Sequence, residues 1–250
     1  MVKITMIGHS TLVFDFGSVR VLSDPCFSDT MGFPRIINPY RRSPIKLTLE
    51  ELPKIDVIIY SHRHSDHFEL ASIKRMDKNL FVFVPEKWMA EKLIKIGFKN
   101  IIQIKAWEER DIKGIKVTAV PALEGSQGLP QVGYVIVGNG KGIYFGGDTM
   151  IFPEIEEIGK RFKIDVALPP INGVRFLGRQ ADMAPDDAAD AVIKTGAKMA
   201  IPQHYDLLFG FPLNLAYKAP GMPEDFEKAI KRKTNDVLVK TLGSGESIEI

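Results

Sequence analysis

Residues 56–68 read DVIIYSHRHSDHF, a strand-like run that leads directly into a cluster of histidines and aspartate. Residues 56–60 are mostly apolar, which predicts a strand buried on both faces of a sheet. Three of the five histidines of the chain and one aspartate follow within six positions, at His62, His64, Asp66 and His67. Functional groups gather beyond the carboxyl ends of strands in α/β proteins, and imidazole with carboxylate suits zinc, manganese or iron. The stretch therefore predicts a metal site.

The spacing of these four residues allows two neighbouring ions. On an extended turn, His62 and His64 point to the same side and can share one ion. Asp66 and His67 come one turn later and can reach a second ion alongside. A solvated polar loop would give a mixed string of polar residues instead of this succession of ligand types.

Two further candidates stand at the ends of other predicted strands. Asp148 follows two glycines, which let the backbone approach closely and leave the carboxylate at the tip of a turn. On its own, this aspartate would suit a hairpin or a helix cap, but with the histidine cluster present we expect a ligand. A lone histidine is usually structural, yet His204 follows the strand predicted at 199–201, which favours ligation.

Short apolar runs and helical patterns alternate along the rest of the chain. Strands are predicted at residues 4–7, 11–16, 19–22, 80–84, 101–104, 117–120, 132–137, 142–145, 165–168 and 199–201, with two more around Gly243. Helices are predicted at residues 85–96, 152–162, 185–195 and 223–231. Two β-rich halves that each carry helices predict an α/β protein, in which two packed sheets have helices on their outer faces. We expect one domain over residues 1–250.

The composition of the chain indicates in which compartment the protein works and which classes of partner are expected. The net charge of +2 over 250 residues gives no reason to expect a nucleic-acid partner. Cys26 is the one cysteine, so no internal disulfide can form, which fits a reducing compartment. No signal peptide is visible, and no apolar stretch approaches the ~20 residues needed to cross a bilayer. These features predict a cytoplasmic protein without membrane insertion.

The histidine cluster and four other segments resemble one known family. His62-x-His64-x-Asp66-His67 is similar to the signature of the metallo-β-lactamase superfamily. The segments IGHSTLVF, VLSDPCFS, YFGGDTMI and MAIPQHYDLL resemble, in the same order, a branch that contains ascorbate-6-phosphate lactonase and N-acylphosphatidylethanolamine phospholipase D. The resemblance covers nearly the whole chain. It implies an αββα sandwich with one or two divalent ions at its edge, Asp148 as the bridging ligand and His204 as the last histidine ligand.

The chain departs from the family pattern at one position. Most members have a further histidine near the strand predicted at 117–120, where this chain reads TAVPALEGSQG. Glu124 is the one candidate ligand there. Either Glu124 replaces the histidine and shifts the preference toward an ion such as manganese, or the position is empty and one ion binds tightly. Manganese and zinc are the metals we expect.

Two residues near the N-terminus are assigned supporting roles. His9 lies in a Gly-His-Ser turn, where it holds the hairpin by a hydrogen bond or contacts the substrate. We expect Asp24 to orient a ligand histidine rather than to touch the ion, because ligating histidines usually donate their other ring N–H to a carboxylate.

Several polar residues are candidates for substrate binding. Within LPPINGVRFLGRQADM, Asn172, Arg175 and Arg179 could hold an anionic group, although exposed arginines without a ligand would look the same. Tyr205 follows His204 directly. A long stretch without clear periodicity, residues 25–44, is typical of a lid and adds Arg35, Arg41 and Arg42. A basic pocket would suit a small phosphorylated or carboxylated substrate.

The expected chemistry is hydrolysis of a lactone or ester by a metal-activated water, with Asp66 or Asp148 holding the nucleophile and Asp66 carrying a proton to the leaving group. One alternative is a phosphodiesterase of the phospholipase D type. Such an enzyme needs an apolar entry for its lipid substrate, which Phe27 and residues 33–37 could supply. A di-iron electron carrier would need a flavin partner domain, which we do not expect from these 250 residues. From a different class, a metal-binding protein without catalysis remains open, and so does a homo-oligomer.

Overall fold

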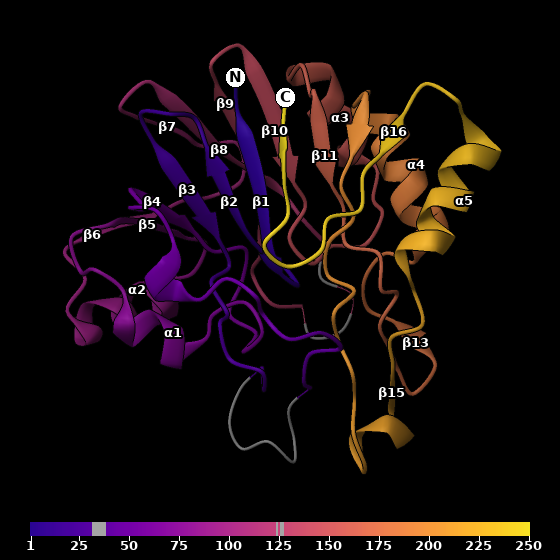
Figure 1. The fold of residues 1–250 in the computed structure, drawn as a ribbon, viewed down its shortest axis with the longest axis horizontal. Coiled ribbons are helices and arrows are strands. Elements are labelled where there is room, and N and C mark those ends of the chain that lie inside the picture. Colours follow the sequence, from indigo (N-terminus) through magenta and orange to yellow (C-terminus); the bar gives the residue numbers. More distant parts are fainter. Residues whose placement is uncertain (32–38, 124, 126–127) are drawn as a thin grey trace.

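The computed structural model describes residues 1–31, 39–123, 125 and 128–250, and it contains two large β-sheets and one small sheet (Figure 1). The strands of the first sheet lie in the order β17-β1-β2-β3-β4-β5-β6. Their bounds are β1 Lys3–Gly8, β2 Thr11–Asp15, β3 Arg20–Ser23, β4 Val57–Ile59, β5 Phe81–Val84, β6 Asn100–Gln103 and β17 Ser247–Glu249.

The second large sheet has the order β16-β14-β11-β10-β9-β8-β7. Its strands are β7 Glu109–Ile112, β8 Ile115–Pro121, β9 Val132–Gly138, β10 Lys141–Phe145, β11 Val166–Leu168, β14 Met199–Ala200 and β16 Leu238–Val239. The small sheet has the order β13-β12-β15 and consists of β12 Arg175–Phe176, β13 Arg179–Gln180 and β15 Tyr217–Lys218. Both large sheets contain parallel and antiparallel pairs.

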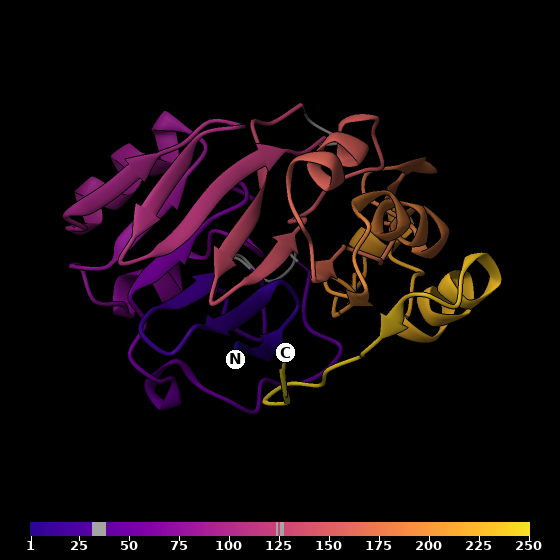
Figure 2. The same cartoon turned by 90° about the horizontal axis from the view of Figure 1, so that it is seen from above.

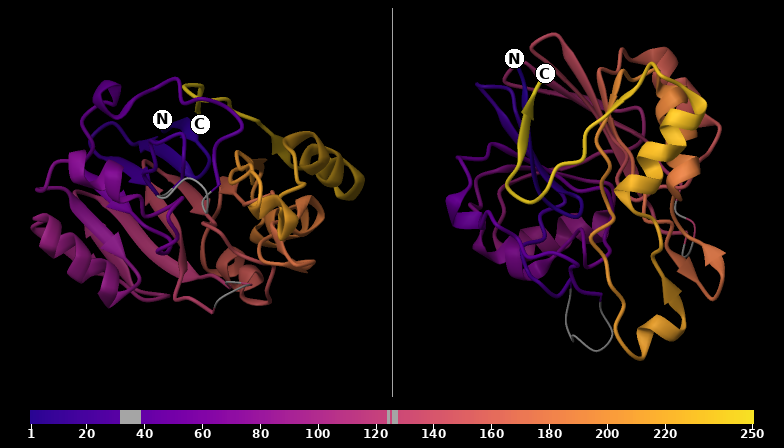
Figure 3. Two further views of the ribbon diagram at one scale, coloured as in Figure 1. Left: turned by 90° about the horizontal axis from the view of Figure 1, so that it is seen from below. Right: turned by 45° about the vertical axis from the view of Figure 1, so that its right-hand side comes forward.

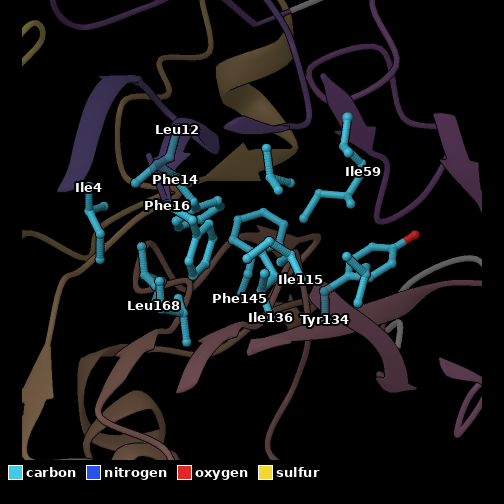
Figure 4. Packing of buried hydrophobic residues seen from close by; sticks show 14 of the residues in the cluster. Ile4, Leu12, Phe14, Phe16, Ile59, Ile115, Tyr134, Ile136, Phe145 and Leu168 are labelled. Atoms are coloured by element: carbon cyan, nitrogen blue, oxygen red, sulfur yellow. The ribbon is translucent and has the colours of Figure 1, made fainter. Parts of the chain in front are cut away.

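The two large sheets pack against each other through a continuous apolar core. Figure 4 shows side chains from both sheets in this layer, among them Phe14 and Ile59 from the first and Tyr134 and Phe145 from the second. Alternation along β9 explains the arrangement, since Tyr134 faces this core while its neighbour Val135 faces the helices on the other side.

The helices cover the outer faces of the sheets. On the first sheet, α1 (Leu70–Arg75) and α2 (Lys87–Ile96) contribute Ile73, Met89 and Leu93 to a second core. On the second sheet, α3 (Glu154–Arg161), α4 (Pro185–Thr195) and α5 (Pro223–Lys233) form a third core. Figure 2 shows these two groups, purple and orange to yellow, at opposite ends of the view. The predicted fold class, an αββα sandwich of two mixed sheets, is confirmed.

Most predicted elements are present within one or two residues of their expected ends. The predicted helix over 85–96 begins at Lys87 and stops at Gly97, whose left-handed φ of 105° ends it as expected. The predictions lacked α1, β7, the small sheet and the 3-10 helices Leu49–Glu51 and Leu213–Leu215. These elements are short, and several have only two residues, so they leave little periodicity in the sequence.

The described ends of the stretch 25–44 are held in place by hydrogen bonds. Tyr40 pairs with Thr30 and with Leu208 in isolated bridges. The guanidinium of Arg41 donates to the carbonyl oxygens of Ser28 and Cys26. Residues 32–38, with Arg35 and most of the apolar entry considered above, lie outside the described residues.

One edge of the sandwich collects the carboxyl ends of the strands that matter for function. β3, β4 and β5 run parallel in the first sheet, while β10, β11 and β14 run parallel in the second. The residues that follow β3, β4, β10 and β14 are those singled out by the sequence: Asp24, the histidine cluster, Asp148 and His204. Strand direction therefore brings together residues that lie far apart in the chain.

Candidate metal centre

Eight histidine and aspartate side chains converge at this edge in two adjacent groups and in a third, made of Asp148, Asp182 and His204, that overlaps them. The His62 cluster comprises His62, His64 and Asp148, and the His67 cluster comprises His9, Asp66, His67 and His204. Within each group, one nitrogen or oxygen atom from every member lies within 4.8 Å of the others. Both groups draw on both large sheets, because Asp148 and His204 follow strands of the second sheet.

In the His67 cluster, ring nitrogens face each other at short distance. His67 Nε2 lies 3.0 Å from His204 Nε2, and Asp66 Oδ2 lies 3.6 and 3.5 Å from these two atoms. His9 approaches from the β1–β2 turn, and its Nε2 is 3.2 Å from the same Asp66 oxygen. Three of the four side chains are almost completely buried, and Asp66 is 13% exposed.

The His62 cluster has a similar pair of facing nitrogens. His62 Nε2 lies 2.8 Å from His64 Nδ1, and 3.9 Å from Asp148 Oδ2. The other carboxylate oxygen of Asp148 is 3.8 Å from His204 Nδ1. Asp148 therefore lies between the two clusters.

Asp24 supports the first-sheet histidines from below. Its Oδ2 accepts a hydrogen bond from His67 Nδ1 at 2.7 Å and another from Ser61 Oγ at 2.6 Å. Its Oδ1 accepts from the Ser61 backbone N–H at 2.7 Å. Ser61 Oγ is also 3.0 Å from His62 Nδ1, so the carboxylate orients His67 directly and His62 through Ser61. Both arrangements leave Nε2 of each ring free of a proton and turned toward its cluster.

Asp182 and Asn172 hold His204 from the side of the second sheet. Asp182 Oδ2 lies 3.2 Å and Asn172 Nδ2 3.0 Å from His204 Nδ1. The Val174 backbone N–H donates to Asn172 Oδ1, which fixes the amide with its NH₂ toward the ring. The Asn172 contact has hydrogen-bond geometry, whereas Asp182 Oδ2 lies at ion-pair distance and has no hydrogen-bond partner. A proton on Nδ1, which faces the Asp182 carboxylate, leaves Nε2 facing His67 as an acceptor.

Backbone strain is concentrated at the same place. His9, Asp24 and His204 all have left-handed φ angles, of 58°, 34° and 58°. Side chains other than glycine rarely adopt this conformation, and such residues cluster at functional sites. Next to Asp148, Gly147 has a φ of 65°, and a Cβ there would come within 2.7 Å of Ser61 Cβ. Gly147 is thus required by both conformation and space.

Burial and neighbouring charges shift the pKa values of several side chains in the clusters. Burial raises the pKa of Asp66, yet His67, His204 and His9 outweigh it and hold the pKa well below its usual value. Burial lowers the pKa of His204, but the carboxylates of Asp148, Asp182 and Asp66 outweigh it and raise the pKa well above normal. For His62, burial and the neighbouring imidazoles His67 and His64 both lower the pKa. Burial raises the pKa of Asp148 to about 7.

These residues fit a divalent ion. Two ligand atoms bound at ~2.0–2.2 Å to one ion lie roughly 3 to 3.5 Å apart. The facing nitrogens of His67 and His204 are 3.0 Å apart, and those of His62 and His64 are slightly closer, at 2.8 Å. Asp148 Oδ1 is buried and has no hydrogen-bond partner, although buried polar atoms are usually satisfied. A group of imidazoles and carboxylates with unsatisfied atoms is therefore able to bind metal.

The predicted substrate residues are distributed differently. Asn172 lies beside His204, as described above. The Tyr205 hydroxyl donates to the Leu242 carbonyl oxygen at 3.3 Å, and Arg42 donates to the carbonyl oxygens of Tyr205 and Ala219. Arg175 and Arg179 are exposed on the small sheet. Arg41 and Arg42 donate to main-chain oxygens, and both also line a pocket with Tyr40 and Phe211. Their part in substrate binding stays a prediction.

Three residues that support the clusters are not predicted from the sequence, and one predicted ligand lies outside the described part of the chain. Glu124 lies outside the described residues. Asp182, Ser61 and Gln203 were missed; Gln203 accepts from Ser10 Oγ at 2.6 Å and donates to the Gly147 carbonyl oxygen at 2.6 Å. Ser61 and Gln203 each directly precede a histidine of a cluster, and this adjacency was the available signal. Asp182, ten residues beyond Asn172, carried no such signal.

An αββα sandwich with histidine and aspartate clusters at its edge defines a class, the metal-dependent hydrolases of this fold. A family model described as a beta-lactamase superfamily domain matches residues 19–205. The chain is 32% identical over 250 residues to a UPF0173 metal-dependent hydrolase of Korarchaeum cryptofilum, covering 100% of both. The chain thus belongs to the metallo-β-lactamase superfamily, and it is a metal-dependent hydrolase.

Other similar proteins extend this picture. N-acyl-phosphatidylethanolamine-hydrolyzing phospholipase D 1 of Caenorhabditis elegans is 28% identical over 223 residues, which cover 80% of this chain and 63% of that protein. A solved structure of a possible metal-dependent hydrolase from Veillonella parvula has a TM-score of 0.83 at 19% identity and covers 100% of both chains. The metallo hydrolase Igni18 from Ignicoccus hospitalis has a TM-score of 0.77 at 23% identity, covering 99% of this chain and 97% of that one. These two structures support the fold.

Proposed function

We propose that the protein is a two-ion phosphodiesterase, in which the His62 cluster and the His67 cluster would each hold one divalent ion, with Asp148 located between the two clusters. The observation that carries this proposal is the Asp148 carboxylate, whose Oδ2 lies 3.9 Å from His62 Nε2 and whose Oδ1, on the side of His204, is buried without a hydrogen-bond partner. Paired ions about 3.5–4 Å apart are common in enzymes that cleave phosphate esters, because they stabilise both the attacking and the leaving oxygen. Manganese and zinc are the metals proposed.

The arginines near the clusters support a phosphodiester bound by the ions rather than a substrate bound by arginine side chains. Arg41 and Arg42 donate to main-chain oxygens, and Arg175 lies exposed on the small sheet. An anionic substrate would then be bound chiefly by the ions. The likeness to a nematode enzyme named as a phospholipase D points the same way.

The protein's own residues would divide the work as follows. Divalent ions supply Lewis acidity and lower the pKa of water toward neutrality. Asp66 is held by His9 at 3.2 Å, which fixes the carboxylate as a hydrogen-bond acceptor for the nucleophile. Asp24 and Asp182 keep the ring nitrogens of His67 and His204 aimed inward. After attack, Asp66 is placed to pass a proton to the leaving group.

A second candidate, hydrolysis of a small lactone or ester, uses the same centre. It is favoured by Asn172, whose amide lies at the His204 side of the site and could hold a carbonyl substituent or an anionic group. This candidate needs only one ion, because a single Lewis acid can polarise a carbonyl.

The test compares substrates and metal content on one preparation. The protein is purified without a histidine tag, stripped with a chelator and reloaded with Mn²⁺ or Zn²⁺ in steps. We expect turnover of bis(4-nitrophenyl) phosphate to appear only as the second equivalent binds. Full activity on a lactone with one equivalent, and none on the phosphodiester, would favour the second candidate. Metal binding without turnover of phosphodiester, ester or lactone would leave a metal-binding protein without catalysis.

A further inference from the structure

The small sheet and the segment that follows it expose large apolar side chains to solvent. Phe211, Leu215 and Leu177 are 79%, 74% and 70% exposed, and Phe176 is 40% exposed. Figure 1 and the right-hand view of Figure 3 show β13, β15 and the adjoining 3-10 helix projecting from the end of the molecule opposite the two chain termini. We call these four residues, together with Arg175, Arg179 and Lys218, the basic apolar tip.

The members of the tip form one surface. The Leu177 backbone N–H donates to the Ala216 carbonyl oxygen at 2.8 Å, which places Leu177 beside Leu215. The ring of Phe176 packs on Tyr217 with centroids 4.8 Å apart. Phe211 precedes the 3-10 helix Leu213–Leu215, and the Asn214 N–H closes this turn onto Gly210. Exposed apolar groups that gather in this way usually mark an interaction site.

The charge of the tip has a single sign. Residues 173–181 and 207–221 contain Arg175, Arg179 and Lys218 but no aspartate or glutamate. Arg175 stands opposite Lys218 in the pairing of β12 with β15. Among the residues that the structure describes, neither Arg175 nor Arg179 has an ion-pair partner, and the Lys218 ammonium donates to the Asn214 carbonyl oxygen.

We infer that the basic apolar tip docks the protein on the surface of a bilayer that contains anionic lipids. Apolar side chains that enter the headgroup region, surrounded by arginine and lysine, are the elements of peripheral membrane binding. A second copy of the chain fits less well, because a two-fold interface would bring two sets of cations together without acidic partners. No helix among the described residues is long and apolar enough to span a membrane, so the contact is peripheral.

The tip is attached directly beside the metal centre. Asn172, which contacts His204, is three residues before β12, and the Gly221 N–H that follows β15 returns to the Asn172 carbonyl oxygen at 2.8 Å. Docking would therefore present this edge of the sandwich to the lipid surface. The inference concerns binding and stands apart from which bond the enzyme cleaves.

The experiment measures co-sedimentation of the full chain with vesicles. Vesicles of phosphatidylcholine alone are compared with vesicles that also contain phosphatidylglycerol. We expect binding to the mixed vesicles only, and a loss of at least about tenfold in partitioning for the double variant Leu177→Ser/Leu215→Ser. Arg175→Glu/Lys218→Glu should lose binding as well, and added salt should weaken that of the unaltered protein.

Matched controls separate docking from general stickiness. Leu238→Ser and Ile94→Ser remove side chains that are 51% and 62% exposed elsewhere, and both should bind vesicles like the unaltered protein. Circular dichroism and thermal melting verify that every variant is folded. No binding to either vesicle type by the unaltered protein, or equal losses in the controls, would overturn the inference. So would a Leu177→Ser/Leu215→Ser variant that dissociates an oligomer in light scattering while its vesicle binding stays unchanged.

Discussion

The His62 cluster and the His67 cluster stand side by side, but they are supported very differently. In the His67 cluster, the outer nitrogen of His67 donates to Asp24, and that of His204 meets Asp182 and Asn172. In the His62 cluster, His62 reaches Asp24 only through Ser61, and His64 Nε2 has no partner. Outer hydrogen bonds fix the tautomer and the direction of a ligand ring. We therefore expect the His67 cluster to bind its ion more tightly.

The difference shows how preorganisation can be divided within one centre. A cluster whose rings are already fixed loses little conformational entropy when the ion arrives. A cluster with fewer fixed rings binds more weakly and exchanges its ion more readily. The absence of a histidine near 117–122, with Glu124 as the one carboxylate there, adds to this asymmetry.

Removing a supported ligand should have the largest effect. We expect His67→Ala to lose metal from the His67 cluster and to reduce turnover by more than the roughly 100-fold that loss of an outer partner costs. Elemental analysis and phosphodiester turnover measure both effects. Near-normal turnover with one ion missing would show that the His62 cluster alone carries the reaction.

Removing His64, whose outer nitrogen has no partner, should show how the two clusters differ in metal affinity. We predict that His64→Ala keeps about one equivalent of metal, bound as tightly as before, and loses most of its phosphodiesterase activity. Competition with a coloured chelator gives the affinity of the remaining ion. Loss of both ions in this variant would contradict the ranking of the two clusters.

The shared support beneath the histidines can be tested with a conservative substitution. Asp24→Asn keeps the shape of the buried side chain but removes the charged acceptor for His67 Nδ1 at 2.7 Å. Metal affinity of the His67 cluster should fall about 10- to 100-fold, with a smaller loss at the His62 cluster. Asp15→Asn, a half-exposed partner of Arg20, is the matched control and should leave both affinities unchanged.

Asp182→Asn should produce a milder loss. The distance of 3.2 Å to His204 is longer than the Asp24 bond, and Asn172 still contacts the ring. We expect about tenfold weaker binding at the His67 cluster. Because an amide at 182 could leave His204 in the other tautomer, ¹⁵N imidazole shifts provide a readout beyond affinity. An unchanged tautomer and unchanged affinity would remove Asp182 from the support of the site.

The smallest predicted effect is that of pH on metal affinity. The folded, metal-free pKa of Asp148 is raised to about 7, so this carboxyl takes up a proton below that value. A cation must displace the proton, and affinity therefore falls as the pH falls. From about pH 7.5 to about pH 6.5 the Asp148 contribution alone amounts to about threefold. Calorimetry in buffers of different ionisation enthalpy detects the released proton, and a pH-independent affinity would contradict the bridging role.

The sequence predicted the sandwich, and it singled out six of the clustered side chains as ligands, because both leave strong local signals; His9 was expected to hold the hairpin or to contact the substrate. Continuous apolar runs mark the strands, and His62 to His67 lie within six positions. Asp182 could not be found in this way, since one aspartate in a polar turn looks like a surface residue until the fold brings it to His204. The charge of Arg41 predicts substrate binding, and this role stays a prediction, because the guanidinium is bound to main-chain oxygens and also lines a pocket. The roles of the individual ligands and the single domain stay predictions.

The metal centre takes its ligands from both large sheets, and His67 and His204 are separated by 137 positions in the chain. An ion held between them is in effect a removable cross-link that closes a long loop. Such a link stabilises the native state by mass action, by about 2.7 kcal/mol when the free ion is at a hundred times its dissociation constant. The supply of metal in the cell would then determine how fast proteases degrade the chain. When the ion is scarce, the protein would be degraded faster.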